Sequence, residues 1–301
     1  MNNSRLFYQF YKAISLGFNP GADKHSYKRD RNKKTKIFSY ADRRNIIKVT
    51  NQLCKFLSEN YIYLNNIKDI NYNHINKFFE YKSYCSCRTL KNYKYCIKKL
   101  QKLVREYLYI KVNYIDERGV KFNTIECLRM IDMSKDDLDI LLNECKKSKS
   151  KAAIGIEVAV LFGLRVSEIC KLKAKDIDLE KMSLIVFEGK GKRSRGIRIN
   201  SLEQLELCIR IKKKYEENDR VCPLKEDSVN AAIRRMLLKN KITVYKEHFT
   251  GVHAIRKSYA KNTYEALLSQ GYEERIAWDK TANNLGHGKD RKALKNVYIR
   301  Y

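Results

Sequence analysis

The chain has 301 residues, of which 63 are lysine or arginine and 34 are acidic, giving a formal net charge of +29. So large a positive charge attracts polyanions and releases their counterions on contact, which makes nucleic acid the expected partner. Hydrophobic residues form 44% of the chain, enough for sizeable cores. Because no apolar run reaches about 18 residues and no signal-peptide pattern opens the chain, we expect neither a membrane span nor a secretory leader.

The nine cysteines are dispersed along the chain. Cys85 and Cys87 form a CxC and Cys96 follows, but no CxxC pair occurs. A zinc site needs four ligands at compatible spacing, so we expect no metal site here. A scattered, odd set of cysteines is typical of reduced thiols, which favours a cytoplasmic protein. With nucleic acid as its expected partner, we expect it to be nucleoid-associated.

The length suits two domains, preceded by a basic segment over residues 1–36. Its stretch NPGADKHSYKRDRNKK combines turn formers with charge and has no apolar period, which predicts a flexible arm. The arm could follow a DNA backbone or could simply be solvated. Its basic cluster is Lys28, Arg29, Arg31, Lys33, Lys34 and Lys36.

Residues 37–115 are predicted to form a helical, DNA-binding unit, the core-binding domain. Apolar residues recur at helical spacing from Tyr40, and further helices are expected over residues 74–81 and 87–108. In the third helix, lysines lie beside the apolar face and alternate with tyrosines, as suits a helix laid along phosphates; a solvated face is the alternative. These lysines are Lys91, Lys94, Lys98, Lys99 and Lys102.

Residues 110–133 break the helical period, and 116–133 are predicted to connect the two domains, of which the second, the catalytic domain, spans 134–301. Ser134 followed by Asp137 predicts a capped helix start. A buried helix is expected over residues 152–162, ending at Gly163. Two short strands, 183–187 and 196–199, flank the basic turn GKGKRSR, and helices resume from Leu202. The fold class predicted is mainly α with a small antiparallel β-sheet.

Four segments of the second domain carry chemistry: GLRVSEI (163–169), EGKGKRSRGIRI (188–199), HAIRKSYA (253–260) and LGHGKDRKALKNVYIRY (285–301). Each has a structural explanation when taken singly. Arg165 could pair with Glu168, His253 with Arg256 could be a buried polar pair, and His287 could cap a helix.

Together the four segments resemble the tyrosine recombinase (phage integrase) family. That family presents an arginine in a GLRxSE-like segment, a lysine in a β-hairpin, HxxR, LGH and then a tyrosine, and all appear here in that order. The resemblance covers about residues 134–301 closely and the helical unit only in general character. Its spacing is similar to that of integrases of integrative elements and prophages, which are mobile genetic elements, rather than to compact chromosome-dimer resolvases.

The resemblance implies a DNA recombinase that forms a covalent 3′-phosphotyrosyl intermediate without metal or ATP. Two guanidinium groups match the non-bridging oxygens of the phosphodiester transition state, and Arg165 and Arg256 are the candidates. By resemblance Lys190 protonates the leaving 5′-oxygen, with Lys192 as its rival. His253 and His287 could move protons or bind the phosphate. No cofactor is implied.

The nucleophile is predicted to be Tyr298 rather than Tyr301. Both lie on one helix face with Leu294 and Val297, so packing is the alternative explanation for each. The place of Tyr298 in KNVYIR resembles the family's tyrosine segment. Tyr301 is the last residue, where helices fray and the terminal carboxylate would repel the scissile phosphate.

The resemblance further implies a clamp of the two domains around double-stranded DNA and a homotetramer on two duplexes, which an accessory DNA-bending protein could assist. The chain stops three residues after Tyr298, whereas many family members continue and dock that segment into a neighbouring protomer. Either another element makes that contact between protomers here, or the chain was shortened.

Other activities explain part of the same pattern. A type IB topoisomerase or telomere-resolving enzyme would use the same chemistry without synapsing two sites. A DNA-binding relative without catalysis is disfavoured because every catalytic position holds a competent residue. A basic RNA-binding protein would explain the charge and not the ordered motifs.

Overall fold

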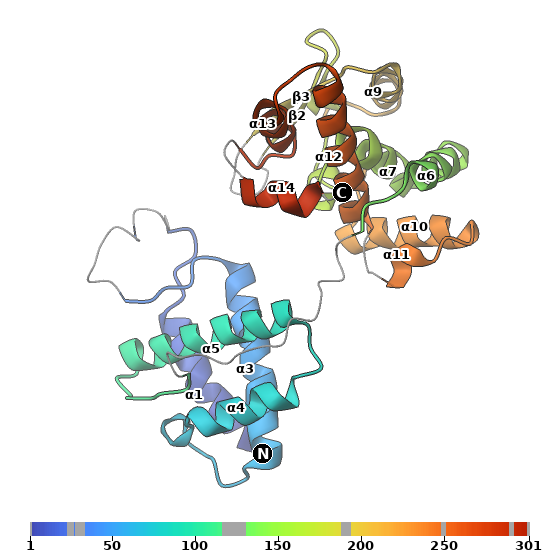
Figure 1. Cartoon of the computed structure of the whole chain (residues 1–301). Coiled ribbons are helices and arrows are strands. Elements are labelled where there is room, and N and C mark those ends of the chain that lie inside the picture. Colours follow the sequence, from blue (N-terminus) through green and yellow to red (C-terminus); the bar gives the residue numbers. More distant parts are fainter. Residues whose placement is uncertain are drawn as a thin grey trace. The chain divides into compact units, whose positions relative to one another are not determined.

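The computed structural model describes residues 2–22, 27, 34–115, 131–187, 194–247, 251–288 and 292–299. The chain divides into two compact units, Met1–Cys127 (unit 1) and Leu128–Tyr301 (unit 2), each with its own apolar core (Figure 1). Helices dominate both units, and the strands of the described residues form one sheet in unit 2. The predicted class, mainly α with a small antiparallel sheet, is confirmed. Within those residues, no helix combines the length and apolarity that crossing a membrane requires.

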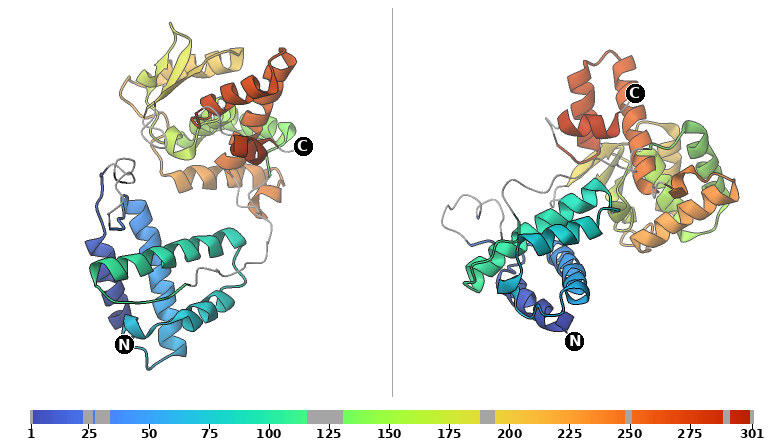
Figure 2. Two further views of the ribbon diagram at one scale, coloured as in Figure 1. Left: turned by 60° about the vertical axis from the view of Figure 1, so that its left-hand side comes forward. Right: turned by 60° about the horizontal axis from the view of Figure 1, so that its bottom comes forward.

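Unit 1 is a helical bundle (Figure 2), and three of its helices start at polar caps. The side chains of Ser39, Asn71 and Ser86 accept hydrogen bonds from backbone amides in the first turns of α3, α4 and α5. The three helices that the apolar spacing predicts are present. The elements are α1 (Asn2–Leu16), α3 (Tyr40–Asn60), the 3-10 helix η1 (Ile67–Asp69), α4 (Tyr72–Tyr81) and α5 (Cys87–Tyr107).

The prediction of a flexible arm over residues 1–36 is wrong for residues 2–16, which form α1. Leu6, Phe10, Ala13 and Ile14 are fully buried in the core of unit 1, where α1 packs on α3 and α5. Their helical spacing is visible in the sequence. The flexible arm was predicted because the basic, turn-forming stretch that follows them has no apolar period. Helix α1 is therefore part of the core that holds the bundle together.

The basic cluster of the predicted arm lies mostly outside the described residues, because Lys28, Arg29, Arg31 and Lys33 fall there. Lys34 and Lys36 are described, and both place their ammonium groups over tyrosine rings. Lys34 lies 5.0 Å from the ring centre of Tyr109, and Lys36 lies 4.8 Å from that of Tyr27. Both lysines thus make cation–π contacts within unit 1.

Unit 2 opens with α6 (Lys135–Lys147) and α7 (Lys151–Phe162). The Ser134 side chain accepts a hydrogen bond from the Asp137 amide, as its place in the sequence predicts. Helix α7 is buried along most of its length and ends at Gly163, whose φ of 61° is left-handed, as the glycine predicts. Residues 116–130 of the predicted connection lie outside the described residues, whereas Met133 already packs in the core of unit 2.

The sheet of unit 2 has three antiparallel strands in the order β1-β2-β3. The predicted strands 183–187 and 196–199 correspond to β2 (Ser183–Val186) and β3 (Arg195–Arg198), which pair Ser183 with Arg198 and Val186 with Arg195. The two-residue strand β1 (Ile177–Asp178) was not foreseen, because so short a segment shows no alternation. Lys190 and Lys192, which follow β2 and precede β3 in the sequence, lie outside the described residues.

Helix α12 is central to the second half of unit 2, since it packs against α7, α10, α13 and α14. A separate cluster of buried residues, including Tyr264, Trp278 and Tyr298, joins α12, α13 and α14. This packing brings the last helix of the chain against the helix that carries His253 and Arg256. The remaining elements are α8 (Val166–Ile169), η2 (Ala174–Asp176), α9 (Leu202–Lys214), α10 (Glu226–Lys239), α11 (Val244–Glu247), α12 (Val252–Ser269), α13 (Glu274–Asn284) and α14 (Lys292–Tyr298).

Replacing Gly163 with alanine should destabilise unit 2 strongly. A Cβ there would lie 2.2 Å from Tyr259 Cδ1, on a backbone with φ of +61°. Strain and overpacking together should cost about 3 kcal/mol. Gly271 is the matched control, because its φ is +84° and nothing lies within 4 Å of a Cβ built there. Gly271→Ala should cost only about 1 kcal/mol. Equal losses of unfolding free energy in denaturant titrations would show that the contact with Tyr259 is unimportant.

Candidate active site

Arg165 stands at the start of α8, directly after the turn that ends α7. Its backbone amide donates to Glu168 Oε2 at 2.9 Å, and its Nη1 donates to Glu168 Oε1 at 2.7 Å. The pairing with Glu168 that the sequence left open as a structural explanation is therefore present. This pairing orients Arg165. It is compatible with a catalytic role, because only Nη1 of the guanidinium donates to Glu168.

Arg256, on α12, is a buried cation with 2% of its surface exposed. Its Nη1 donates to the Gly163 carbonyl and its Nη2 to the Leu285 carbonyl. Gly163 and Leu285 are the C-caps of α7 and α13, so the guanidinium lies between the carbonyl ends of two helices. Burial lowers the pKa of Arg256, while the nearby Tyr298 hydroxyl acts in the opposite direction.

Tyr298, the last residue of α14, is 8% exposed and meets both Arg256 and His287. Its hydroxyl lies 3.0 Å from His287 Nε2, a hydrogen bond whose donor depends on the imidazole tautomer, and Arg256 Nε donates to it at 3.5 Å. The ring centre of His253 lies 6.3 Å from that of Tyr298. The phenol oxygen therefore stands beside a permanent cation and a group that can exchange protons near neutral pH.

Five of the residues selected from the sequence thus occupy one region of unit 2. Tyr298 contacts Arg256, His287 and His253, and the charge of Arg165 acts on Arg256. Lys190 and its rival Lys192 lie outside the described residues, as does Tyr301, the rival of Tyr298. The assembly draws on α8, α12, α14 and the turn after α13, elements far apart in the sequence.

Sequence reasoning missed two residues of this region, Arg195 and Trp278. Arg195, on β3, donates from Nη1 and Nη2 to the two carboxylate oxygens of Glu168, each at 2.9 Å. Trp278, the only tryptophan of the chain, has its ring centre 6.4 Å from that of Tyr298. Strand alternation could have indicated Arg195, since it shares a strand face with the buried Ile197.

Glu168 is a buried carboxylate held ionised by arginines. Burial alone would raise its pKa, but hydrogen bonds from Arg195 and from the Arg165 amide outweigh burial and lower the pKa to about 2. Glu168 is thus negatively charged at neutral pH and forms ion pairs with both Arg165 and Arg195.

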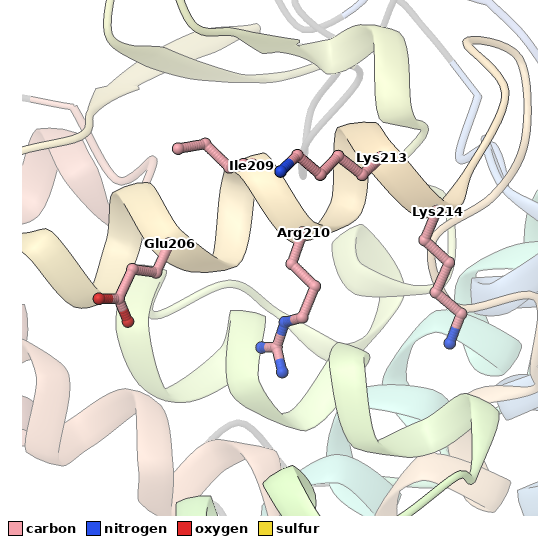
Figure 3. Close-up of a pocket in the computed structure, with 5 residues that line it drawn as sticks. All are labelled: Glu206, Ile209, Arg210, Lys213 and Lys214. Atoms are coloured by element: carbon pink, nitrogen blue, oxygen red, sulfur yellow. The ribbon is translucent and has the colours of Figure 1, made fainter.

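A surface depression of about 480 Å³ runs along α9 (Figure 3), and none of the active-site residues lines it. Its lining includes Arg210, whose guanidinium forms an ion pair with the buried Glu157 of α7. The other lining residues are Glu206, Ile209, Lys213 and Lys214. Among the residues that the structure describes, no three His, Cys, Asp or Glu side chains gather as metal ligands would.

Comparison with known proteins agrees with the ordered motifs. Residues 132–272 match the model of the phage integrase family. The fold is similar to that of the XerH site-specific recombinase bound to difH substrate in a pre-cleavage complex, with a TM-score of 0.60 and 19% identity over 86% of this chain and 76% of that chain. Among curated protein sequences, none matches the chain.

Two further solved structures are similar in fold. A lambda integrase tetramer bound to a Holliday junction has a TM-score of 0.62 at 16% identity, covering 98% of this chain and 78% of that chain. The Tn1549 transposon integrase in complex with circular intermediate DNA has a TM-score of 0.60 at 16% identity, covering 98% and 95%. The resemblance to the tyrosine recombinases is confirmed for residues 132–272, which match the family model, and for the fold.

The depressed pKa of Glu168 makes a prediction for acid stability. Its folded pKa of about 2 lies below the ordinary 4.5, so its contribution is complete above pH 4.5 and is lost as the pH falls toward 2. The difference corresponds to about 3 kcal/mol. Glu168→Gln should be less stable than the native chain at pH 7, and the gap should narrow at acid pH. Glu206→Gln, an exposed change on α9, should follow the native curve. A gap that stays constant in denaturant titrations from pH 7 to pH 3 would contradict the assignment.

Proposed function

We propose that this chain, whose residues 132–272 match the phage integrase family, is a site-specific DNA recombinase that cleaves and rejoins duplex DNA through a 3′-phosphotyrosyl bond at Tyr298. The observation that carries the proposal is the Tyr298 hydroxyl, which lies 3.0 Å from His287 Nε2 and 3.5 Å from Arg256 Nε. A phenol needs neighbouring positive charge and a proton acceptor to attack at neutral pH.

The cleavage step transfers the scissile phosphate from a 5′-oxygen to tyrosine. The Tyr298 oxygen attacks the phosphorus, and its proton passes to His287. The bond from phosphorus to the 5′-oxygen breaks, and Lys190, or its rival Lys192, protonates the leaving oxygen. The phosphotyrosyl bond keeps the energy of the broken linkage, so rejoining is the reverse reaction and needs no ATP.

Arg165 and Arg256 stabilise the charge that develops on the non-bridging oxygens. A guanidinium has five N–H donors. Arg256 directs one each to Gly163, Leu285 and Tyr298, which leaves others for a phosphate. Because two fixed cations supply the positive charge that a metal would bring, the reaction is proposed to need no metal ion. His253, whose ring lies beside that of Tyr298, is proposed to contact the phosphate.

Unit 1 is proposed to bind DNA through α5 and to close with unit 2 as a clamp. Lys91, Lys98 and Lys102 are exposed on α5 and available for phosphates. Lys99 is less available, because its ammonium lies 2.6 Å from Asp42 with 12% of the side chain exposed. The working assembly is proposed to be a tetramer on two duplexes; the lambda integrase of similar fold forms a tetramer bound to a Holliday junction.

A nicked suicide substrate tests the nucleophile. On such DNA the cleaved fragment diffuses away, so the covalent complex accumulates and can be seen on a denaturing gel. The native chain should form the complex in EDTA. Tyr298→Phe should bind the same DNA and form none, because the attacking oxygen is gone.

Tyr301→Phe is the matched control and should form the complex at the native level. Loss of the complex in Tyr301→Phe but not in Tyr298→Phe would reverse the assignment. A requirement for added magnesium in the native reaction would contradict the metal-free mechanism.

Replacing Arg256 with lysine should separate catalysis from binding. Lysine keeps the positive charge but cannot reach two carbonyls, the phenol and a phosphate at once. Single-turnover cleavage should fall by about 100-fold or more, the scale of one lost transition-state donor. Affinity for DNA should change little, because dozens of other basic residues contribute to it. Equal losses of rate and affinity would make Arg256 a binding residue. Lys213→Ala, at the depression along α9, should leave the cleavage rate unchanged.

A further inference from the structure

Arg195 is a nearly buried cation at the start of β3. Its side chain is 7% exposed, and its two terminal nitrogens donate to the two carboxylate oxygens of Glu168 at 2.9 Å each. Such a two-point contact is the strongest arrangement an arginine and a carboxylate can adopt. The third donor, Nε, points elsewhere and reaches the carbonyl of Asn284 at 2.7 Å.

The Arg195 guanidinium also packs against the turn that leads into His287. Gly286, the residue before His287, has φ of +68°, and a Cβ built there would lie 2.7 Å from Arg195 Nη1. Only glycine fits beside the guanidinium in this conformation. Arg195 thus contacts the elements on both sides of the proposed phosphate site, the Arg165 turn through Glu168 and the His287 turn directly.

Glu168 accepts hydrogen bonds from two arginines, and both neutralise its single negative charge. Loss of one arginine therefore changes how much of that charge the other must neutralise. In the described part of the chain its ion pairs are with Arg165, at 2.7 Å, and with Arg195, at 2.9 Å. A buried carboxylate needs a full complement of donors and a compensating charge. Arg195 supplies two donors and one charge. Without them, Arg165 would be left to neutralise Glu168, and fewer of its donors would be free for a phosphate.

We propose that Arg195 is a positioning residue for strand cleavage: by neutralising Glu168 it leaves the guanidinium of Arg165 free to bind the scissile phosphate. The inference rests on the proposed function, in which Arg165 binds that phosphate. Arg195 itself touches neither the phosphate nor the tyrosine in this scheme and acts through Glu168.

Arg195→Ala should cleave a suicide substrate on the order of 100-fold more slowly than the native chain, as expected when one transition-state donor is withdrawn. DNA affinity should stay within about threefold, because one charge of many is lost. Arg198→Ala is the matched control, since Arg198 lies on the same strand but is exposed. It removes the same charge from β3 and should cleave at the native rate.

The decisive variant combines Arg195→Ala with Glu168→Gln. Glutamine keeps an oxygen that can accept from Arg165 but has no charge to neutralise, so Arg165 is released. The double variant should cleave at least about tenfold faster than Arg195→Ala alone, a non-additivity that direct coupling produces. A role in packing alone predicts the opposite, a double variant as slow as the single or slower, and that result would overturn the proposal.

If Arg195→Ala does not fold, the Arg195→Gln variant tests the same proposal. Glutamine can donate a hydrogen bond to Glu168 but cannot neutralise it, so cleavage should remain slow in a folded protein, as judged by its thermal unfolding. Native-rate cleavage by Arg195→Gln would overturn the proposal. If the native chain forms no covalent complex at all, the proposed function fails; if it does and Arg195→Ala matches it, only this inference fails.

Discussion

The burial of one positive charge, that of Arg256, constrains the rest of unit 2. Removing a guanidinium from water is costly unless its donors are satisfied. Here the acceptors are the carbonyls of Gly163 and Leu285, the C-caps of α7 and α13, where helix ends carry partial negative charge. These acceptors are uncharged, so they hold the guanidinium without cancelling its charge. The cation remains able to attract a phosphate.

The same contacts organise the residues around Arg256. Gly163 immediately precedes the turn that carries Arg165, and Leu285 precedes the turn that carries His287. Because both carbonyls bind one guanidinium, both turns are fixed relative to α12 and to Tyr298, whose hydroxyl lies beside Arg256. Glu168 and Arg195 join the same turns a second time, from the side of β3. These backbone contacts fix the arrangement of the side chains, and the proposed phosphoryl transfer requires such a rigid site.

Much of this organisation could be predicted from the sequence, and the reasons for success and failure differ. The Ser134 cap, the end of α7 at Gly163 and the β2–β3 hairpin depend on local residues, so local patterns predicted them. Helix α1 was missed because neighbouring charge obscured its apolar face. The contact of Arg195 with Glu168 joins residues 27 positions apart, and no local period encodes such a pair. The family resemblance identified the residues that belong to the family's motifs. It did not identify Arg195, which contacts two of the turns that carry them.

The central claim is that the oxygen of Tyr298, and no other, becomes bonded to DNA. The direct measurement is mass spectrometry of the covalent complex after digestion of both the protein and the DNA. The account predicts a nucleotide adduct on the peptide that contains Tyr298, with fragment ions that place the added mass on that tyrosine and on the 3′-phosphate of the cleaved strand. An adduct on Tyr301 or on a serine, or a 5′-phosphate linkage, would contradict it.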